Sequence, residues 1–282
     1  MTTLIDNKKI NNELMESFLG DMRVSGKSEN TIKNYRIDIR NLLEYIGDNH
    51  LNDVTFKDAT NYRLYLLEEK EFKGVSVNRK ISSAKAMFKY LVEKKDVEDN
   101  PFKEVGNLKI TVEEKFKPRI LTREEANLLL STIEKSSSYN RDHCSSFLIK
   151  RDLLLVNLML RVGLRVNEII TLTRSQIDFE NNSMRIDTTS GVRVVPFVDA
   201  IRKVYFEYIR EREQKFGLTG EDEPILVSVN GNKLCETDVL ARIVKYCDIA
   251  GINDPNDCRN RVTNDSLRHS FATIFANNGS LI

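Results

Sequence analysis

The chain has 282 residues, of which 40% are hydrophobic and 30% charged, and its formal net charge is +1 at pH 7. This length accommodates two domains of ordinary size, each able to bury its own core. The sequence has neither a membrane-length apolar run nor a signal-peptide hydrophobic region, so we expect a cytoplasmic protein without a membrane partner. A net charge near zero argues mildly against nucleic-acid binding, because phosphate contact usually goes with a basic chain.

The four cysteines lack the C-x-x-C spacing, or any other spacing, of a metal-ligand set. They are Cys144, Cys235, Cys247 and Cys258. Since the chain has only three histidines, the sequence predicts reduced thiols and neither a metal nor another cofactor.

Residues 1–105 are predicted to form an N-terminal helical domain with four helices, of which the first begins near residue 11. The second helix follows Ser28 as its N-cap and ends at Gly47. The third begins after a Thr-x-x-Asp capping box at Thr55, and the fourth spans about 76–95. No strand pattern precedes residue 105, so this domain is predicted to be all-helical.

Residues 106–118 are polar and lack periodicity, which predicts a linker. Residues 119–282 are predicted to form a second domain that opens with a capping box at Thr122. A long apolar helix at about 151–160 precedes three alternating segments, typical of a small antiparallel sheet, at 176–179, 183–187 and 192–197. Further helices are predicted at 200–216, 237–250 and 266–277. The predicted fold class is mainly α with a small antiparallel β-sheet, an α+β protein.

Two helix faces of the N-terminal domain carry basic residues. On the second helix, the i, i+3 and i+7 positions are Lys33, Arg36 and Arg40. On the fourth helix, a polar face is formed by Asn78, Ser82, Lys85 and Lys89, with Arg79 and Lys80 beside it. One interpretation places both faces on DNA, with the cations on phosphates and Asn78 or Ser82 near base edges. The other interpretation is a pair of solvated, charged helix faces.

Two distant segments carry arginines in patterns that suit phosphate binding. They are Gly163-Leu164-Arg165-Val166-Asn167-Glu168 and Leu267-Arg268-His269-Ser270-Phe271-Ala272-Thr273. A guanidinium donates two hydrogen bonds to a phosphate and stays charged at any working pH. The alternatives are a surface arginine in a turn at Arg165 and a charge pair at a helix end at Arg268.

Together these segments resemble the tyrosine recombinase (phage integrase) family, in which arginines of a G-L-R-x-x-E turn and an L-R-H-[ST]-F-A-T segment clamp the DNA phosphate that is cut. The resemblance covers the chain from about residue 11 to its end. It implies an N-terminal helical core-binding (SAM-like) domain, whose second and fourth helices approach the DNA groove, and an integrase-type catalytic domain. It also implies catalytic roles for Arg165, Arg268 and His269, with Glu168 orienting the first arginine.

The same resemblance implies double-stranded DNA as the partner and chemistry without a metal. It further implies a homo- or heterotetramer on DNA, formed from chains that are monomers in solution.

Three features depart from the family pattern. The lysine expected on a hairpin turn is absent from residues 187–192, which precede the R-x-V-P segment Arg193-Val194-Val195-Pro196. Asp265 stands where the family has a histidine, and an ionised aspartate repels phosphate unless it is salt-bridged or turned away. No tyrosine follows Tyr246, so we expect that these 282 residues do not form the covalent phosphotyrosyl intermediate.

Three functional hypotheses remain. The first is a DNA-binding site-specific recombinase or integrase that breaks and rejoins DNA through a phosphotyrosyl intermediate, inactive as this chain because the nucleophile lies beyond residue 282. The second is a catalytically inactive relative that binds DNA as a regulator, since a shortened chain does not explain the missing lysine and histidine. The third is a helical protein-interaction module, which only the near-neutral charge favours.

Overall fold

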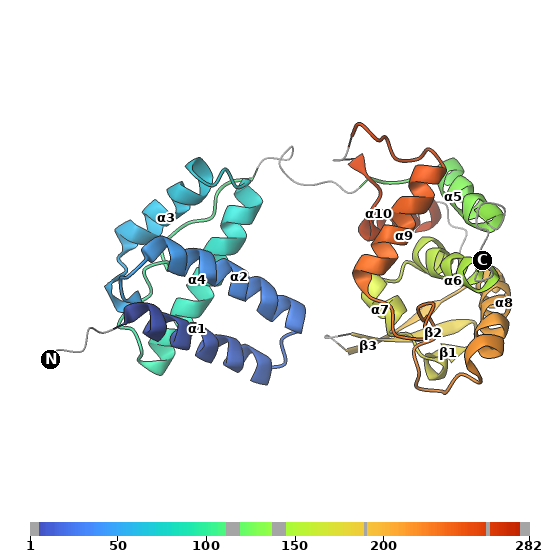
Figure 1. Cartoon of the computed structure of the whole chain (residues 1–282), viewed down its shortest axis with the longest axis horizontal. Coiled ribbons are helices and arrows are strands. Elements are labelled where there is room, and N and C mark those ends of the chain that lie inside the picture. The colour runs from blue at the N-terminus through green and yellow to red at the C-terminus, as the bar shows by residue number, and fades with distance from the viewer. Residues whose placement is uncertain (1–5, 111–118, 137–144, 189–190, 258–259, 277–282) are drawn as a thin grey trace. The chain divides into compact units, whose positions relative to one another are not determined.

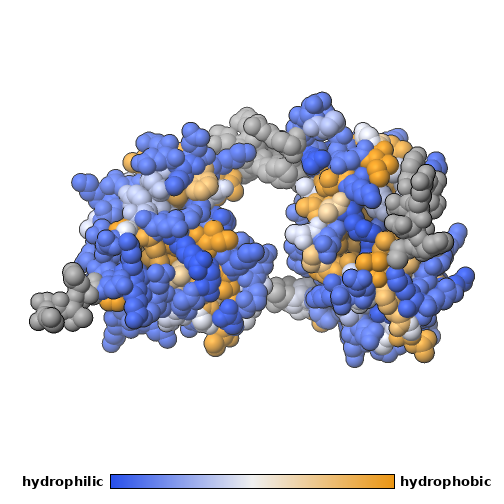
Figure 2. Space-filling model, in the orientation of Figure 1, coloured by the Kyte–Doolittle hydropathy of each residue, from blue (hydrophilic) through white to orange (hydrophobic). Residues whose placement is uncertain are grey.

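The computed structural model describes residues 6–110, 119–136, 145–188, 191–257 and 260–276. The chain forms two compact units, Met1–Phe116 and Lys117–Ile282, and each is described by itself (Figure 1). The fold is mostly helical with one small antiparallel sheet, which confirms the predicted fold class. On the face shown in Figure 2, the side chains of both units are mainly hydrophilic, with hydrophobic patches among them. Within the described ranges, no helix has the length and apolar character needed to span a bilayer.

The first unit is a bundle of the four predicted helices. They are α1 (Asn7–Val24), α2 (Glu29–Ile46), α3 (Phe56–Glu68) and α4 (Gly74–Lys94). Local hydrogen bonds fix the starts of α2 and α3 where the sequence predicts them. The Ser28 hydroxyl accepts from the Thr31 N–H, and Thr55 forms the predicted capping box with Asp58. Helix α4 contacts the other three helices, and its Phe88 is fully buried at the centre of the core.

A buried ionic cluster joins α2 to α4. The Asp38 side chain is fully buried, and its carboxylate lies 2.6 Å from Arg79 Nη1 and 3.1 Å from Lys80 Nζ. The Ser83 hydroxyl donates to the same carboxylate at 2.9 Å. Lys80 is only 4% exposed, so removing its counter-charge leaves an ammonium ion buried without compensation.

We therefore expect Asp38→Asn to lower the free energy of unfolding of the first unit by about 3 kcal/mol, as for other broken buried ion pairs. Urea denaturation followed by circular dichroism measures this. Glu44→Gln is the matched control, because Glu44 is an exposed acid on the same helix and has no ion pair among the described residues. Its free energy of unfolding should stay within about 0.5 kcal/mol of that of the parent. Equal effects of the two variants would contradict the assigned role of Asp38.

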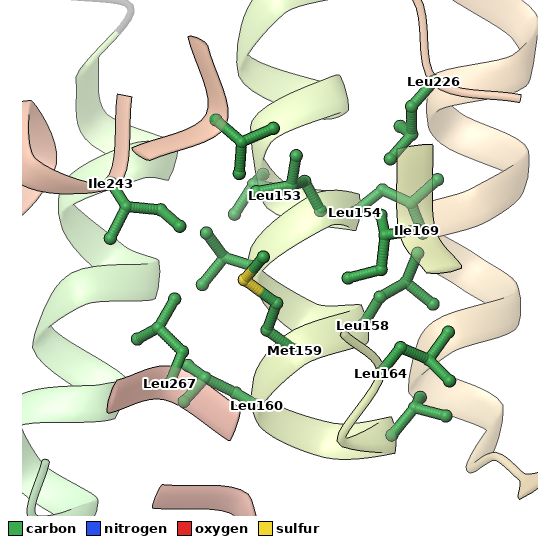
Figure 3. Packing of buried hydrophobic residues seen from close by; sticks show 14 of the residues in the cluster. Leu153, Leu154, Leu158, Met159, Leu160, Leu164, Ile169, Leu226, Ile243 and Leu267 are labelled. Carbon is green, nitrogen blue, oxygen red and sulfur yellow. The ribbon is translucent and has the colours of Figure 1, made fainter. Parts of the chain in front are cut away.

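The second unit surrounds one apolar helix. Its helices are α5 (Arg123–Lys135), α6 (Ser145–Asn157), α7 (Val166–Ile170), α8 (Asp199–Phe216), α9 (Glu236–Ile249) and α10 (Asn264–Phe271). Helix α6 continues into a π-helical turn at Leu158–Val162, and α10 into another at Ala272–Ala276. Side chains of α6 and its π-helical turn meet Ile243 of α9, Leu267 of α10 and Leu226 in one cluster (Figure 3). Helix α6 therefore anchors the elements that carry the candidate site.

The sheet has three strands in the order β1-β2-β3, all antiparallel. They are β1 (Ile177–Asp178), β2 (Ser183–Thr188) and β3 (Gly191–Pro196), close to the three predicted segments. In the register of β2 and β3, Ile186 pairs with Arg193 and Arg185 pairs with Val194. Paired residues point to the same face of a sheet, so Arg193 shares the face of the buried Ile186, whereas Val194 and Arg185 are exposed.

A second buried carboxylate links α6 to α9. Asp152 is 1% exposed and accepts hydrogen bonds from Arg151, Arg242 and the Tyr246 hydroxyl, the last at 2.9 Å. Tyr246 is itself buried, with 8% exposure. Burial, the negative charge of Asp152 and this hydrogen bond raise the pKa of the Tyr246 hydroxyl well above its ordinary value.

Candidate nucleic-acid interface

The two arginine segments of the sequence meet at a glycine. Gly163 ends the π-helical turn after α6 with φ at +71°, a conformation that side chains with a Cβ rarely adopt. A Cβ built at Gly163 would lie 2.4 Å from Cδ1 of Phe271 in α10. The turn that leads into Arg165 therefore packs directly on the helix that carries Arg268 and His269, and only glycine permits so close an approach.

Gly163→Ala should combine backbone strain with a clash against the Phe271 ring, and we expect it to destabilise the second unit by about 3 kcal/mol. Thermal unfolding measures the loss. Gly251→Ala is the matched control because Gly251 has a similar φ of +67° but no neighbouring atom within 4 Å of the place where an alanine Cβ would stand. It should cost only about 1 kcal/mol from strain. If the two variants unfold alike, the contact with Phe271 is not what requires glycine.

Arg165 is the N-cap residue of α7 and is fixed by Glu168 one turn later. Its backbone N–H donates to Glu168 Oε2 at 2.8 Å, and its Nη1 lies 3.3 Å from Oε1. The Arg165 side chain remains 54% exposed, whereas that of Glu168 is 9% exposed. The predicted orienting role of Glu168 thus has a geometry that suits it, since a buried carboxylate restrains an exposed guanidinium.

Glu168 has a second partner, Arg193 of β3, whose Nη2 lies 2.8 Å from Oε2. Burial alone would raise the pKa of the Glu168 carboxyl. Hydrogen bonds from the Arg165 N–H and the Arg193 guanidinium, together with the charges of both arginines, outweigh burial and hold this pKa below its ordinary value. In the sequence, Arg193 stands out only as part of an R-x-V-P segment. The alternation of β3 was the one signal that could have placed it on the inner face.

Helix α10 presents Arg268 and His269 on its accessible side. Arg268 is half-buried and His269 exposed, while Leu267 and Ser270 are fully buried. Asp265 is exposed, and no ion pair joins it to Arg268 within the part of the chain that the structure describes. The Arg268 guanidinium likewise has no carboxylate within 4.0 Å among the described residues. The salt bridge that would have neutralised Asp265 is therefore not formed there.

The orientation of α10 is fixed from its buried side. The Ser270 hydroxyl accepts from the Leu121 N–H at 2.8 Å and donates to the Ser266 carbonyl at 2.7 Å. The Thr263 capping box closes the first turn of the same helix. These bonds hold the helix against the start of the second unit, so the direction of Arg268 and His269 is set by buried polar contacts.

The hairpin between β2 and β3 offers no lysine in its described part. The Thr188 hydroxyl donates to the Gly191 carbonyl at 2.6 Å across the turn, and residues 189 and 190 lie outside the described residues. The outer face of β3 exposes Val192 and Val194, at 62% and 67%. Arg193 is therefore the cation that this hairpin places next to the Arg165 turn.

The basic residues of the first unit differ in how free their charges are. Lys33, Arg40 and Ser82 are exposed. Lys85 and Lys89 are exposed and only weakly engaged, since Lys85 Nζ donates to the Lys103 carbonyl at 2.6 Å and Lys89 lies 3.8 Å from Glu93. Three others are paired with carboxylates: Arg36 with Glu16, and both Arg79 and Lys80 with Asp38. Lys80 was expected beside the basic face. It is instead buried between α2 and α4, where its ammonium group forms an ion pair with Asp38.

Asn78 has both halves of its amide occupied. Its Nδ2 donates to the Leu108 carbonyl at 3.0 Å, and its Oδ1 accepts from the Leu108 N–H at 2.8 Å. Nearby, the Ile110 side chain lies 2.8 Å from where a Cβ of Gly74 would stand. Residues 106–110, interpreted from the sequence as linker, are thus attached to α4, and Asn78 serves that attachment.

Two free cysteines are described: Cys235 is exposed and Cys247 buried. Cys144 and Cys258 lie outside the described residues. Burial raises the pKa of the Cys247 thiol to about 12, which keeps it protonated at neutral pH.

Two family models match the chain. Residues 119–281 match the phage integrase family, and residues 14–97 match the phage integrase N-terminal SAM-like domain. A tyrosine recombinase XerC from Staphylococcus aureus is 30% identical over 276 residues, which cover 95% of this chain and 85% of that protein.

Solved structures show the same fold at lower identity. The Tn1549 transposon integrase in complex with transposon right end DNA is 21% identical with a TM-score of 0.70, covering 94% of this chain and 87% of that one. A lambda integrase tetramer bound to a Holliday junction is 17% identical with a TM-score of 0.68, covering 95% and 73%. At these identities the likeness establishes the fold, and the roles of individual side chains rest on the geometry above.

Proposed function

This chain belongs to the phage integrase family, and on that premise we propose that it binds double-stranded DNA and holds a backbone phosphate with Arg165 and Arg268. The observation that supports this most directly is the packing of Gly163 against Phe271, which keeps the two arginine-bearing segments in contact. Both guanidiniums are at least partly accessible. A phosphate can therefore reach both cations, which lie on two segments that pack against each other.

The arginines would act by stabilising charge. During attack on a phosphodiester, negative charge grows on the non-bridging oxygens, and fixed guanidiniums stabilise that state more than the ground state. By analogy with oxyanion holes, one such donor contributes about 3–4 kcal/mol to the stability of the transition state. His269, exposed beside Arg268, can donate a further hydrogen bond to the same phosphate.

Strand breakage through a phosphotyrosyl intermediate requires a tyrosine at this site. Tyr246 does not suit that role, because its hydroxyl is buried and donates to Asp152, and a phenol with a raised pKa is a weak nucleophile. We assign phosphate binding and charge stabilisation to these residues, and the proposed DNA breakage and rejoining depends on a tyrosine supplied to the site.

The second candidate is a regulator that binds DNA without cutting it. Exposed Asp265, on the same helix as Arg268, adds a negative charge near the proposed phosphate position, and the described part of the hairpin brings no lysine. Both candidates bind DNA through the same arginines. Only the recombinase forms a covalent protein–DNA species when a tyrosine is supplied, so trapping that species separates the two.

For the first unit, we propose that DNA phosphates are contacted by the exposed cations of α2 and α4, namely Lys33, Arg40, Lys85 and Lys89. Ser82 lies among them on α4, whereas Arg36 and Arg79 are partly neutralised by their carboxylate partners. Asn78 reaches a base edge only if it releases Leu108. By analogy with the tetrameric lambda integrase complex, we propose that chains assemble as a tetramer on DNA.

Arg165→Ala should raise the dissociation constant for duplex DNA about tenfold and lower the slope of log K against log salt by about one, because one phosphate contact is lost. Fluorescence anisotropy with a labelled mixed-sequence duplex, over a potassium chloride series, measures both. Arg210→Ala controls for the loss of charge alone. It removes an exposed arginine of α8, the helix that packs against α6. A parent protein whose binding does not depend on salt would instead favour the protein-interaction module.

Lys85→Ala and Lys89→Ala should each weaken DNA binding across sequences and lower the salt slope by about one. Lys94→Ala is the control on the same helix, since nine residues of helix turn it roughly to the opposite side from Lys85. An unchanged slope in both test variants would mean that this face of α4 does not lie on DNA.

A further inference from the structure

We propose that Arg193 is a positioning residue that neutralises Glu168 and thereby leaves the charge of Arg165 available to a phosphate. This inference rests on the proposed function, because it concerns how Arg165 would bind the DNA backbone. It assigns to the β2–β3 hairpin a task in the site that does not require a lysine on its turn.

Two arginines share the Glu168 carboxylate. Glu168 Oε2 receives the Arg165 N–H and Arg193 Nη2, both at 2.8 Å, while Oε1 is 3.3 Å from Arg165 Nη1. The shorter guanidinium contact is thus with Arg193. Arg165 uses mainly its backbone N–H to bind Glu168, so most of the donors of its guanidinium have no partner among the described residues.

Because the Glu168 side chain is buried, it matters which arginine neutralises its charge. The Glu168 side chain is 9% exposed, compared with 37% for Arg193 and 54% for Arg165. A carboxylate so shielded from water needs a cationic partner at close range. Without Arg193, the remaining guanidinium beside Glu168 is that of Arg165, which would close into a bidentate pair with it. Glu168 would then compete with the phosphate for Arg165.

The hairpin fixes Arg193 in this place. Arg193 pairs in register with Ile186, which is 2% exposed, so both side chains face the interior. Arg185 pairs with Val194 on the outer face and has no ion pair among the described residues. The same hairpin thus carries two arginines of equal charge on opposite faces, and only one of them reaches Glu168.

The test is the affinity for a labelled mixed-sequence duplex, measured over a salt series for five variants of the full chain. We expect Arg193→Gln to raise the dissociation constant about tenfold, as for the loss of a charged hydrogen bond. Arg185→Gln, with the same loss of charge, should change it about twofold. Glu168→Gln combined with Arg193→Gln should recover most of the lost affinity, because no carboxylate then competes for Arg165 and a glutamine amide oxygen can still accept from the Arg165 N–H.

The double variant with Glu168→Gln also has the net charge of the parent, so a second double variant must show whether net charge alone recovers the affinity. Glu180→Gln combined with Arg193→Gln has the same net charge but keeps Glu168, since Glu180 is an exposed side chain after β1. It should bind as poorly as Arg193→Gln. Thermal unfolding of every variant shows that the fold is retained, and the double variant with Glu168→Gln remains informative if Arg193→Gln alone does not fold.

The outcomes distinguish this inference from the proposed function. If Arg165→Ala binds DNA as the parent does, the proposed function fails. If Arg165→Ala weakens binding but the double variant with Glu168→Gln stays as weak as Arg193→Gln, the inference is overturned and Arg193 contacts DNA itself. Equal losses in Arg193→Gln and Arg185→Gln would overturn it as well, because general charge would then explain both.

Discussion

The contact between Gly163 and the Phe271 ring is the constraint on which the rest of the candidate site depends. This contact packs the turn after α6 directly against helix α10, although the two elements lie far apart in the sequence. On one side of the contact Arg165 begins α7, and on the other Arg268 and His269 lie on the accessible side of α10. A larger residue at position 163 would push these two elements apart and separate the arginines proposed to bind one phosphate.

Buried carboxylates recur as the means by which each unit fixes its basic residues. Asp38 restrains Arg79 and Lys80 in the first unit, Asp152 restrains Arg151 and Arg242 in the second, and Glu168 lies between two arginines in the candidate site. Of these residues, Arg165 stays 54% exposed while Glu168 restrains its guanidinium at 3.3 Å, so it has lost part of its rotamer freedom before a ligand arrives, which lowers the entropic cost of binding an anion. The near-neutral net charge of the chain is thus compatible with local, fixed positive charge.

Local signals in the sequence predicted most of the fold. Helix starts at Ser28, Thr55 and Thr122 depend on hydrogen bonds that span three residues, and the strands depend on alternation, so a short window contains the information. The family motifs located the segments of the candidate site. The partners of individual side chains could not be predicted in this way.

Those partners are set by packing between elements that are distant in sequence. Arg193 meets Glu168 across 25 positions, Asn78 meets Leu108 across 30, and Lys80 meets Asp38 across 42. An alternating or helical pattern assigns a residue to a face, but it does not say which charged group lies opposite that face. For this reason the burial of Lys80 and the engagement of Asn78 both differ from the solvated or DNA-facing positions that the pattern indicates.

The hydrogen bond from Leu121 to Ser270 has a consequence for the order in which the second unit can fold. It joins residues 149 positions apart, and the closing of so long a loop has an entropic cost that local contacts do not share. The Leu121 N–H is buried, so it stays unsatisfied until α10 docks. Arg268 and His269 belong to α10, so they reach their final positions only when this helix docks. A chain in which that docking has not taken place can be largely helical and yet lack the proposed phosphate site.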